Sequence, residues 1–214
     1  MEVSIDVSID HFVLGVGDLN QGILEFEAKT GITPIFGGVH EVLGTHNALV
    51  SLGEGTYLEL LAPLDNSGKM NNAFGNYTLS GLTPLGWVVG TTDAKAMLPL
   101  LQQHNIMNTG IRPLSRKTSE GKELKWTNIF HFTGGQLSLN PFFIDWEVGG
   151  VHPSQATPKG CRLSRFTINS VGNDGLTKLL KSLELDIRFS TKVGMESGIL
   201  LELELETPKG LVKF

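Results

Sequence analysis

The sequence predicts an α+β fold in which β-α-β-β-β units repeat along the chain and form curved mixed sheets with the helices outside. Three residues that can cap a helix, Asp18, Asp93 and Asn173, lie 75 and 80 residues apart, and a helical pattern follows each of them. Short strand-like runs surround these helices, and 26 glycines and nine prolines supply turns between them. The spacing indicates an internal repeat of one supersecondary unit.

The first unit, residues 1–64, has the clearest pattern. A strand at 9–16 leads to the Asp18 cap and to a helix with an apolar stripe. A strand at 34–40 and a hairpin at 46–63 complete the unit, and glycines in the hairpin turn accept the positive φ that such a turn needs.

Residues 82–147 and 161–214 repeat this order. In the second unit a strand at 82–90 precedes a helical run at 94–104, where Pro99 should either kink the helix or mark its true start. The strand-like segments that follow are 110–114, 125–132 and 136–143. The third unit is shorter, and its predicted strands are 163–170, 187–193 and 199–206. Two linkers separate the units, at 65–81 and 148–160.

The hairpin holds a carboxylate in an unfavourable place. With Glu54-Gly55 as a two-residue turn, Val50 pairs with Glu59. Because side chains alternate along a strand, the face that carries Glu59 also carries His46, Ala48, Val50, Tyr57 and Leu61. A carboxylate among apolar neighbours is costly unless a cation, a metal ion or a proton accompanies it. The alternative is that this face is open to water and Glu59 is solvated.

The composition argues against several classes of protein. The net charge is −5 and no basic stripe is present, so we expect no nucleic-acid partner. No apolar run approaches the roughly 20 residues that a membrane helix needs, and the acidic N-terminus lacks the basic start of a secretory signal. We therefore expect a cytoplasmic protein without a membrane partner. The single cysteine, Cys161, cannot form an internal disulfide, and we expect a buried or half-buried thiol.

Four stretches carry a resemblance to a known family. They are IDHFVLGV at 9–16, GTHNALVSLGEGTYLELLAP at 44–63, SRKTSEGKELKW at 115–126 and NPFFIDWEVGGVHP at 140–153. Together with the repeated units they resemble the glyoxalase-like domain family (glyoxalase 3-like) of the vicinal oxygen chelate superfamily, over residues 8–153. The resemblance implies a glyoxalase/bleomycin-resistance-like fold, in which paired units form a cup around a divalent metal ion.

In that superfamily the metal ligands come from the opening and closing strands of each unit. The resemblance therefore implies His11 and Glu59 as ligands of Zn, Mn, Ni or Fe. The second unit departs from the pattern, because alignment places Gly86 and the Leu139 region at the corresponding positions. The missing ligands would be His46, His131, Asp145 or water, or the protein holds no metal.

Further residues are candidates for substrate binding. Arg116 suits a carboxylate or phosphate group and Trp126 offers an apolar wall, the alternative being a surface arginine and a core tryptophan. His46 is either a substrate contact at the rim of the cup or a capping histidine without a role. Asp145 lies between large apolar residues, where we expect a structural rather than a catalytic carboxylate. The remaining predicted substrate contacts are Asn47, Phe142 and Trp146.

Two functions are compatible with these residues. In the first, the protein is a metal-assisted lyase, isomerase or dioxygenase-like enzyme in which Glu59 is a metal ligand or a general base. In the second, the same cup binds a small molecule without a metal. In both, the expected partner is a small anionic molecule with an apolar body, and a homodimer is left open.

Overall fold

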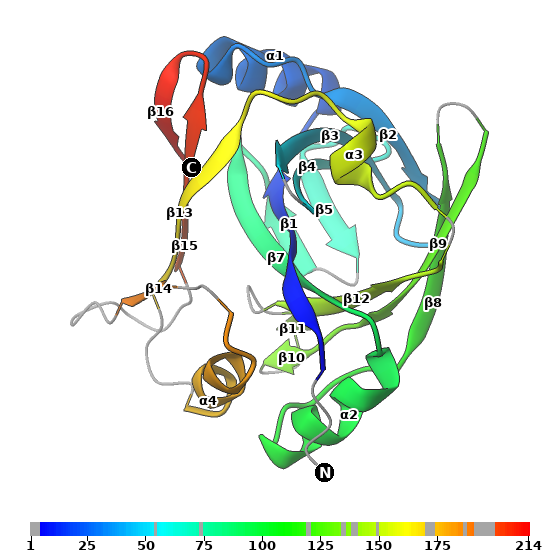
Figure 1. The fold of residues 1–214 in the computed structure, drawn as a ribbon. Coiled ribbons are helices and arrows are strands. Elements are labelled where there is room, and N and C mark those ends of the chain that lie inside the picture. The colour runs from blue at the N-terminus through cyan, green and yellow to red at the C-terminus, as the bar shows by residue number, and fades with distance from the viewer. Residues whose placement is uncertain are drawn as a thin grey trace.

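A closed barrel of eight strands forms the centre of the molecule, and a four-stranded sheet lies beside it (Figure 1). The computed structural model describes residues 5–53, 55–72, 75–118, 121–133, 136–137, 141–148, 150–169, 174–185, 188–190 and 200–214. Across these residues, no helix has both the length and the apolar character needed to span a bilayer.

The first half of the barrel follows the predicted order of strand, helix and three strands. Its elements are β1 (Val7–Gly15), α1 (Leu19–Thr30), β2 (Ile35–His40), β3 (Thr45–Gly53) and β4 (Thr56–Pro63). Asp18 caps α1 as predicted, because its side chain accepts a hydrogen bond of 2.9 Å from the backbone N–H of Gln21. The helix ends at Gly31, whose φ of 82° lies in the left-handed region that favours glycine. β4 runs parallel to β1 and antiparallel to β3.

The second half repeats the arrangement with one difference. Its elements are β7 (Thr83–Thr91), α2 (Ala94–Gln103), β8 (Arg112–Lys117), β9 (Glu123–Ile129) and β12 (Phe142–Trp146). Asp93 caps α2, and the helix continues through Pro99, so this proline does not mark its start. β12 runs parallel to β7, as β4 does to β1. The single strand predicted at 136–143 is wrong, because two short strands, β10 (Phe132–Thr133) and β11 (Gln136–Leu137), pair with each other before β12 begins.

Two pairings close the barrel. β1 and β7 are antiparallel, and β2 meets β8 where Val39 pairs with Lys117. The strand order around the barrel is therefore β1-β4-β3-β2-β8-β9-β12-β7. The segment predicted as a linker between the halves contains a small hairpin of β5 (Lys69–Asn72) and β6 (Gly75–Thr78).

The C-terminal segment forms the second sheet, in the order β14-β13-β15-β16. The elements after the barrel are α3 (Pro153–Ala156), β13 (Arg162–Asn169), α4 (Asp174–Ser182), β14 (Arg188–Ser190), β15 (Leu200–Thr207) and β16 (Gly210–Lys213). β13 is parallel to β14, the strand directly after the helix, whereas β1 and β7 are parallel to β4 and β12. This segment thus has a similar element order but a different pairing. Asn173, the predicted cap of α4, lies outside the described residues.

The main apolar core lies outside the barrel wall. The residues of β1 and β4 that face away from the interior join one buried cluster with residues of both large helices and of the C-terminal sheet, among them Phe12, Leu14, Leu58, Leu60, Phe26, Met97, Leu101, Phe166 and Leu203. Figure 1 shows α1 and α2 on the outside of the barrel. Burial of each large apolar side chain stabilises the fold by about 1.5–3 kcal/mol. The interior can therefore carry polar side chains without loss of the main core.

Candidate active site

The hairpin of β3 and β4 positions Glu59, but in a different register from the one predicted. The pairing shifts between Ser51 and Gly53, so that Leu49, not Val50, lies opposite Glu59. Such a bulge places one extra residue in one strand and reverses the faces of all residues beyond it. As a result Asn47 and Leu49, rather than His46 and Val50, share the interior face with Glu59.

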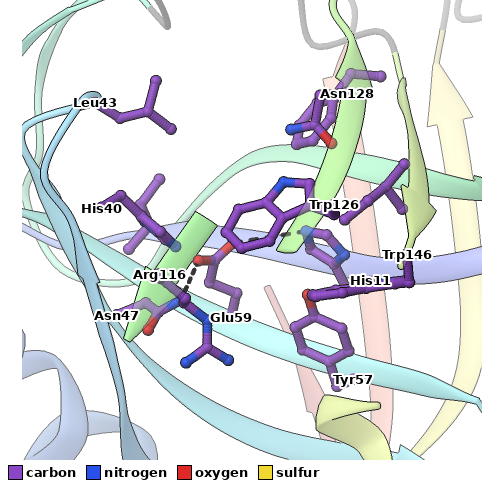
Figure 2. A pocket seen from close by; sticks show the side chains of 13 residues that line it. His11, His40, Leu43, Asn47, Tyr57, Glu59, Arg116, Trp126, Asn128 and Trp146 are labelled. Carbon is purple, nitrogen blue, oxygen red and sulfur yellow. Dashed lines mark hydrogen bonds and ion pairs between the residues drawn. The ribbon is translucent and has the colours of Figure 1, made fainter. Parts of the chain in front are cut away.

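Glu59 is buried, with 7% of its surface exposed, so the alternative of a solvated carboxylate is wrong. Its Oε1 accepts a hydrogen bond of 2.6 Å from Nδ2 of Asn47. Its Oε2 lies 3.6 Å from Nε2 of His11. Figure 2 shows Asn47, Arg116 and Glu59 close together, with His11 and Tyr57 facing them.

His11 is held in place by its neighbour in the sequence. Nδ1 of His11 lies 2.6 Å from Oδ1 of Asp10, and the ring stacks on Tyr57 with 4.5 Å between the centroids. Adjacent residues of a strand normally point to opposite faces. Here the pairing of β1 with β7 shifts between Ile9 and His11, and Asp10 is the extra residue. The bulge lets the Asp10 carboxylate reach the imidazole of His11.

The carboxylate of Asp10 has two further donors. Its Oδ2 accepts hydrogen bonds of 3.0 Å from Nε1 of Trp146 and from Nε2 of His152. Burial by itself would raise the pKa of Asp10, but the hydrogen bonds from His11 and His152 and their electrostatic effect on the carboxylate outweigh it and lower this pKa to about 2. Asp10 is therefore an anion at neutral pH.

Arg116 is a buried cation, not a surface arginine. Only 6% of its surface is exposed, and its guanidinium donates a hydrogen bond to the backbone carbonyl of Gly37. Burial lowers the pKa of Arg116, while the nearby Tyr57 and Glu59 act in the opposite direction. Among the described residues no carboxylate forms an ion pair with it. A guanidinium has five N–H donors, so Arg116 has further N–H groups that can bind an anion.

These side chains surround a small cavity of about 40 Å³ inside the barrel. Its lining consists of His11, His40, Leu43, Asn47, Tyr57, Glu59, Leu61, Arg116, Trp126, Asn128, Phe142, Ile144 and Trp146. Trp126 packs on Trp146 with 5.3 Å between the ring centroids, and Phe142 lies edge-on to His11. Sites for drug-sized ligands measure about 300–1,000 Å³. A ligand of more than a few atoms therefore requires wall side chains to move.

The second half of the barrel offers no counterpart to His11. Where β1 and β7 meet, His11 pairs with Val88 and Val13 pairs with Gly86. This antiparallel register relates His11 to Gly86 by an approximate two-fold axis, as the sequence alignment proposed. Glycine has no side chain with which to bind a metal or a proton.

The counterpart of Glu59 differs from the one predicted. Val13 pairs with Glu59 in the first half, and its two-fold mate Val88 pairs with Phe142 in the second. Phe142 therefore takes the position assigned to the Leu139 region, and Leu139 itself lies outside the described residues. Its apolar ring cannot bind a metal ion.

Three other predicted candidates lie away from the cavity lining. His46 is half-buried, and its Nε2 lies 3.1 Å from Oδ1 of Asn66. Asp145 accepts a hydrogen bond of 3.0 Å from the backbone N–H of Ala94 at the start of α2, which fits the structural role predicted for it. His131 is buried but does not line the cavity.

Five residues in or next to the site were not predicted from the sequence: His40, Tyr57, Asn128, Asp10 and His152. His40 lines the cavity with its Nδ1 3.1 Å from the hydroxyl of Thr45, and burial lowers its pKa. Burial, with Asp10 and Glu59 nearby, raises the pKa of Tyr57 well above its usual value. Of these residues only Asp10 has a local sequence signal, because it directly precedes His11 in the opening strand. The positions of the other residues in the site depend on strand register.

His11 and Glu59 fit a divalent ion as an open site. Nε2 of His11 and Oε2 of Glu59 face each other, and the Nδ1 side of His11 is occupied by a carboxylate, as in most metal-ligating histidines. Oδ1 of Asn47 and Oδ1 of Asn128 are buried in the same lining and have no hydrogen-bond partner among the described residues. No group of three or more His, Cys, Asp or Glu in the described part of the chain could hold a metal.

Comparison with solved structures shows similarity of fold. A hypothetical protein from Staphylococcus aureus aligns with a TM-score of 0.63 at 18% identity, covering 97% of this chain and 85% of its own. A methylmalonyl-CoA epimerase from Streptomyces coelicolor, solved with 2-nitronate-propionyl-CoA, aligns with a TM-score of 0.45 at 19% identity, covering 68% and 99%. The methylmalonyl-CoA epimerase from Mycobacterium tuberculosis aligns at 0.43 and 19%, covering 68% and 91%. At this identity the comparisons establish the fold alone.

Comparison of sequences identifies the family. No curated protein matches the chain. The sequence model of the glyoxalase-like domain matches residues 9–184, which is most of the chain and includes both halves of the barrel. The chain therefore belongs to the family of glyoxalase-like domains.

Proposed function

We propose that this protein is a glyoxalase-like enzyme that moves a proton in a small anionic substrate, in an isomerase or lyase reaction inside the barrel. The observation that supports this best is the pair of His11 and Glu59, whose Nε2 and Oε2 face each other at 3.6 Å in a buried cavity. General acid–base catalysis requires side chains that can take up and release protons, and these two adjacent groups can each accept a proton.

Arg116 supports an anionic substrate. Within the part of the chain that the structure describes, this buried guanidinium has one hydrogen-bond acceptor, the carbonyl of Gly37, and its charge is incompletely satisfied. A carboxylate or phosphate group of the substrate would complete its hydrogen bonds in a charge-assisted pair. The aromatic rings of Trp126 and Phe142 would pack against the apolar body of the same molecule.

Glu59 is suited to the role of base. Asn47 donates to Oε1 and fixes the carboxylate, which leaves Oε2 on the side of His11 to take a proton from a carbon next to a carbonyl group. Tyr57 lines the same cavity, and because burial raises its pKa the phenol keeps its proton at neutral pH. A neutral phenol can donate a hydrogen bond to the oxyanion that forms when the proton leaves.

His11 and Glu59 are also the residues that would hold a divalent ion, with the remaining positions open to water or substrate. An ion bound there supplies Lewis-acid stabilisation of the oxyanion. With an ion in place, Glu59 acts as a ligand, and Arg116 and Tyr57 keep the roles given above.

A second function uses the same cavity for binding without chemistry. The presence of Gly86 and Phe142 at the positions equivalent to His11 and Glu59 favours it, because half of the barrel then has no reactive group at these positions. In this case the protein would bind a small anion between Arg116 and the aromatic rings.

Hydrogen exchange at carbon distinguishes the two functions. The protein is incubated in D₂O, with and without Zn²⁺ or Mn²⁺, with a panel of small 2-oxo acids, 3-oxo acids and acyl thioesters, and deuterium at carbon is measured by NMR. We expect the wild type to exchange at least one compound and Glu59→Gln to lose this exchange. His46→Ala, which alters a histidine outside the cavity, serves as the control. Binding of an anion by the wild type without exchange of any compound would favour the second function.

A further inference from the structure

A chain of hydrogen bonds runs from α3 to His11. It starts at the backbone N–H of Ser154 in α3, which donates to Nδ1 of His152 at 3.3 Å. Nε2 of His152 lies 3.0 Å from Oδ2 of Asp10, and Oδ1 of Asp10 lies 2.6 Å from Nδ1 of His11. The last atom of the chain, Nε2 of His11, lies 3.6 Å from Glu59.

His152 lines a different cavity from His11. Its side chain is 21% exposed, and it lines an outer cavity of about 330 Å³ with Leu124, Lys125 and Val151. Trp146 lines both this outer cavity and the inner one, and its indole N–H is bonded to Asp10. The chain therefore links a solvent-accessible histidine to the buried one through a single carboxylate.

The donors along the chain determine which ring nitrogen carries each proton. A backbone N–H can only donate, so Nδ1 of His152 is an acceptor, the Ser154 hydroxyl 2.8 Å away donates to it as well, and the proton of a neutral His152 is on Nε2. An indole N–H also can only donate, so Oδ2 of Asp10 receives two hydrogen bonds, from Trp146 and from His152. The carboxylate of Asp10 can only accept, so Nδ1 of His11 must carry a proton.

We propose that Asp10 and His152 are positioning residues that hold His11 in the tautomer with its proton on Nδ1, so that the lone pair of Nε2 points towards the cavity and Glu59. The use of this lone pair, to accept a proton or to bind an ion, rests on the function proposed above. The proton on Nδ1 does not depend on that function, because it follows from the hydrogen bond to Asp10, which is present in the absence of any ligand.

The direct test is NMR of the ligand-free protein with ¹⁵N-labelled histidine, in which long-range ¹H–¹⁵N correlations show which nitrogen of each imidazole is protonated. His11→Gln identifies the signals of His11 by their disappearance. In the wild type we expect Nδ1 of His11 to be protonated and Nε2 to be unprotonated. A wild-type His11 that carries a proton on Nε2, with or without a proton on Nδ1, would overturn the proposal without any further variant.

Asp10→Asn reverses the expected result. The single amide oxygen accepts hydrogen bonds from the N–H groups of Trp146 and His152, so the NH₂ group faces Nδ1 of His11. Nδ1 must then accept, and the proton moves to Nε2. Asp93→Asn is the matched control, since asparagine caps a helix as well as aspartate and Asp93 lies at the start of α2. An unchanged tautomer in Asp10→Asn contradicts the role of Asp10.

His152→Phe tests the outer end of the chain. Phenylalanine keeps the ring contacts with Tyr57 and Trp146 but cannot donate to Asp10. We expect the ratio of the two His11 tautomers to shift at least twofold towards the form protonated on Nε2, and an unchanged ratio would remove His152 from the proposal. Because no substrate or metal is added, failure of the exchange assay leaves these results standing, and the reverse also holds.

Discussion

Asn47 donates a hydrogen bond of 2.6 Å to Glu59 although the two residues are not directly opposite each other in the β3–β4 pair. Asn47 pairs with Leu61 and Leu49 pairs with Glu59, so the contact is diagonal. It depends on the bulge near Leu52, because without it Asn47 would face the outer core. One oxygen of Glu59 is thereby anchored and the other stays available to the cavity.

Asn47→Ala should destabilise the protein and misplace Glu59. Loss of the amide leaves Oε1 of Glu59 buried without its donor, and we expect the free energy of unfolding to fall by about 1–3 kcal/mol. Urea denaturation measures this change. His46→Ala, one residue away but half-buried on Asn66, should change the free energy by less than about 0.5 kcal/mol. If the free energy of unfolding fell equally in the two variants, the hydrogen bond to Glu59 would contribute no more to stability than the contact of His46.

Arg116→Ala should weaken the binding of anionic ligands. Each charge-assisted hydrogen bond contributes about 1.5–3 kcal/mol, so we expect a loss of that size for any ligand whose carboxylate or phosphate reaches Arg116. Calorimetric titration of the anions that bind the wild type gives the difference. Lys125→Ala, which removes an exposed cation of β9, should leave the affinity unchanged. Neutral or cationic ligands that bind as tightly as anionic ones would contradict the prediction.

Glu59→Gln should abolish the uptake of divalent ions. We expect the wild type to bind about one Zn²⁺, Mn²⁺ or Ni²⁺ per chain, weakly, because His11 and Glu59 are two ligands where catalytic sites commonly have three. Glutamine removes the charged ligand and keeps the shape. Titration of each ion into metal-free protein by calorimetry decides the point, with the exposed Glu123→Gln as control. Binding that persists in Glu59→Gln would exclude Glu59 as a ligand.

His40→Gln should reduce the pH dependence of stability. Burial lowers the pKa of His40 below its ordinary value of 6.5, so on acidification the unfolded chain takes up a proton before the folded one. The stability that His40 contributes is therefore complete above pH 6.5 and is lost as the pH falls towards the folded-state pKa. We expect the fall in the free energy of unfolding between about pH 7 and pH 5 to be smaller in the variant. Denaturant titrations at several pH values measure it, and identical slopes would refute the assignment.

The fold could be predicted because its signals are local. Asp18 and Asp93 cap the helices that follow them, and the glycines of the hairpin mark its turn. Such features depend on residues within a few positions of each other, so the order of helices and strands follows from the sequence. The strand pairing in the C-terminal sheet could not be predicted from the sequence, because the choice of a neighbouring strand depends on packing against the rest of the molecule.

The roles proposed for the site residues stay predictions, but the structure shows where these residues lie. Apart from His46 and the alternative ligands His131 and Asp145, all of the predicted residues line the cavity, namely His11, Asn47, Glu59, Arg116, Trp126, Phe142 and Trp146. The register of the hairpin was wrong, because a bulge at Leu52 reverses the faces of a strand and leaves no mark in the pattern of apolar residues.

Asp10 and His152 were not predicted as site residues, and the reason is again a bulge. They are 142 positions apart, and their contact exists only because a bulge in β1 turns Asp10 towards the segment that enters α3. A sequence pattern of period two assigns Asp10 to the face opposite His11. Only in the folded protein do the two histidines meet the same carboxylate.

Because the main apolar core lies outside the barrel wall, the residues that pack this core differ from the residues that line the cavity. Phe12, Leu14, Leu58 and Leu60 hold the wall against the helices and the C-terminal sheet, and none of them faces the cavity. Substitutions of polar side chains in the interior therefore leave this main core in place, although they change contacts within the cavity. Gly86 and Phe142 illustrate this freedom, because the same wall surrounds a half without any ionisable group at those two positions. A barrel of this construction can acquire a new reaction by a few inward-facing substitutions while its architecture persists.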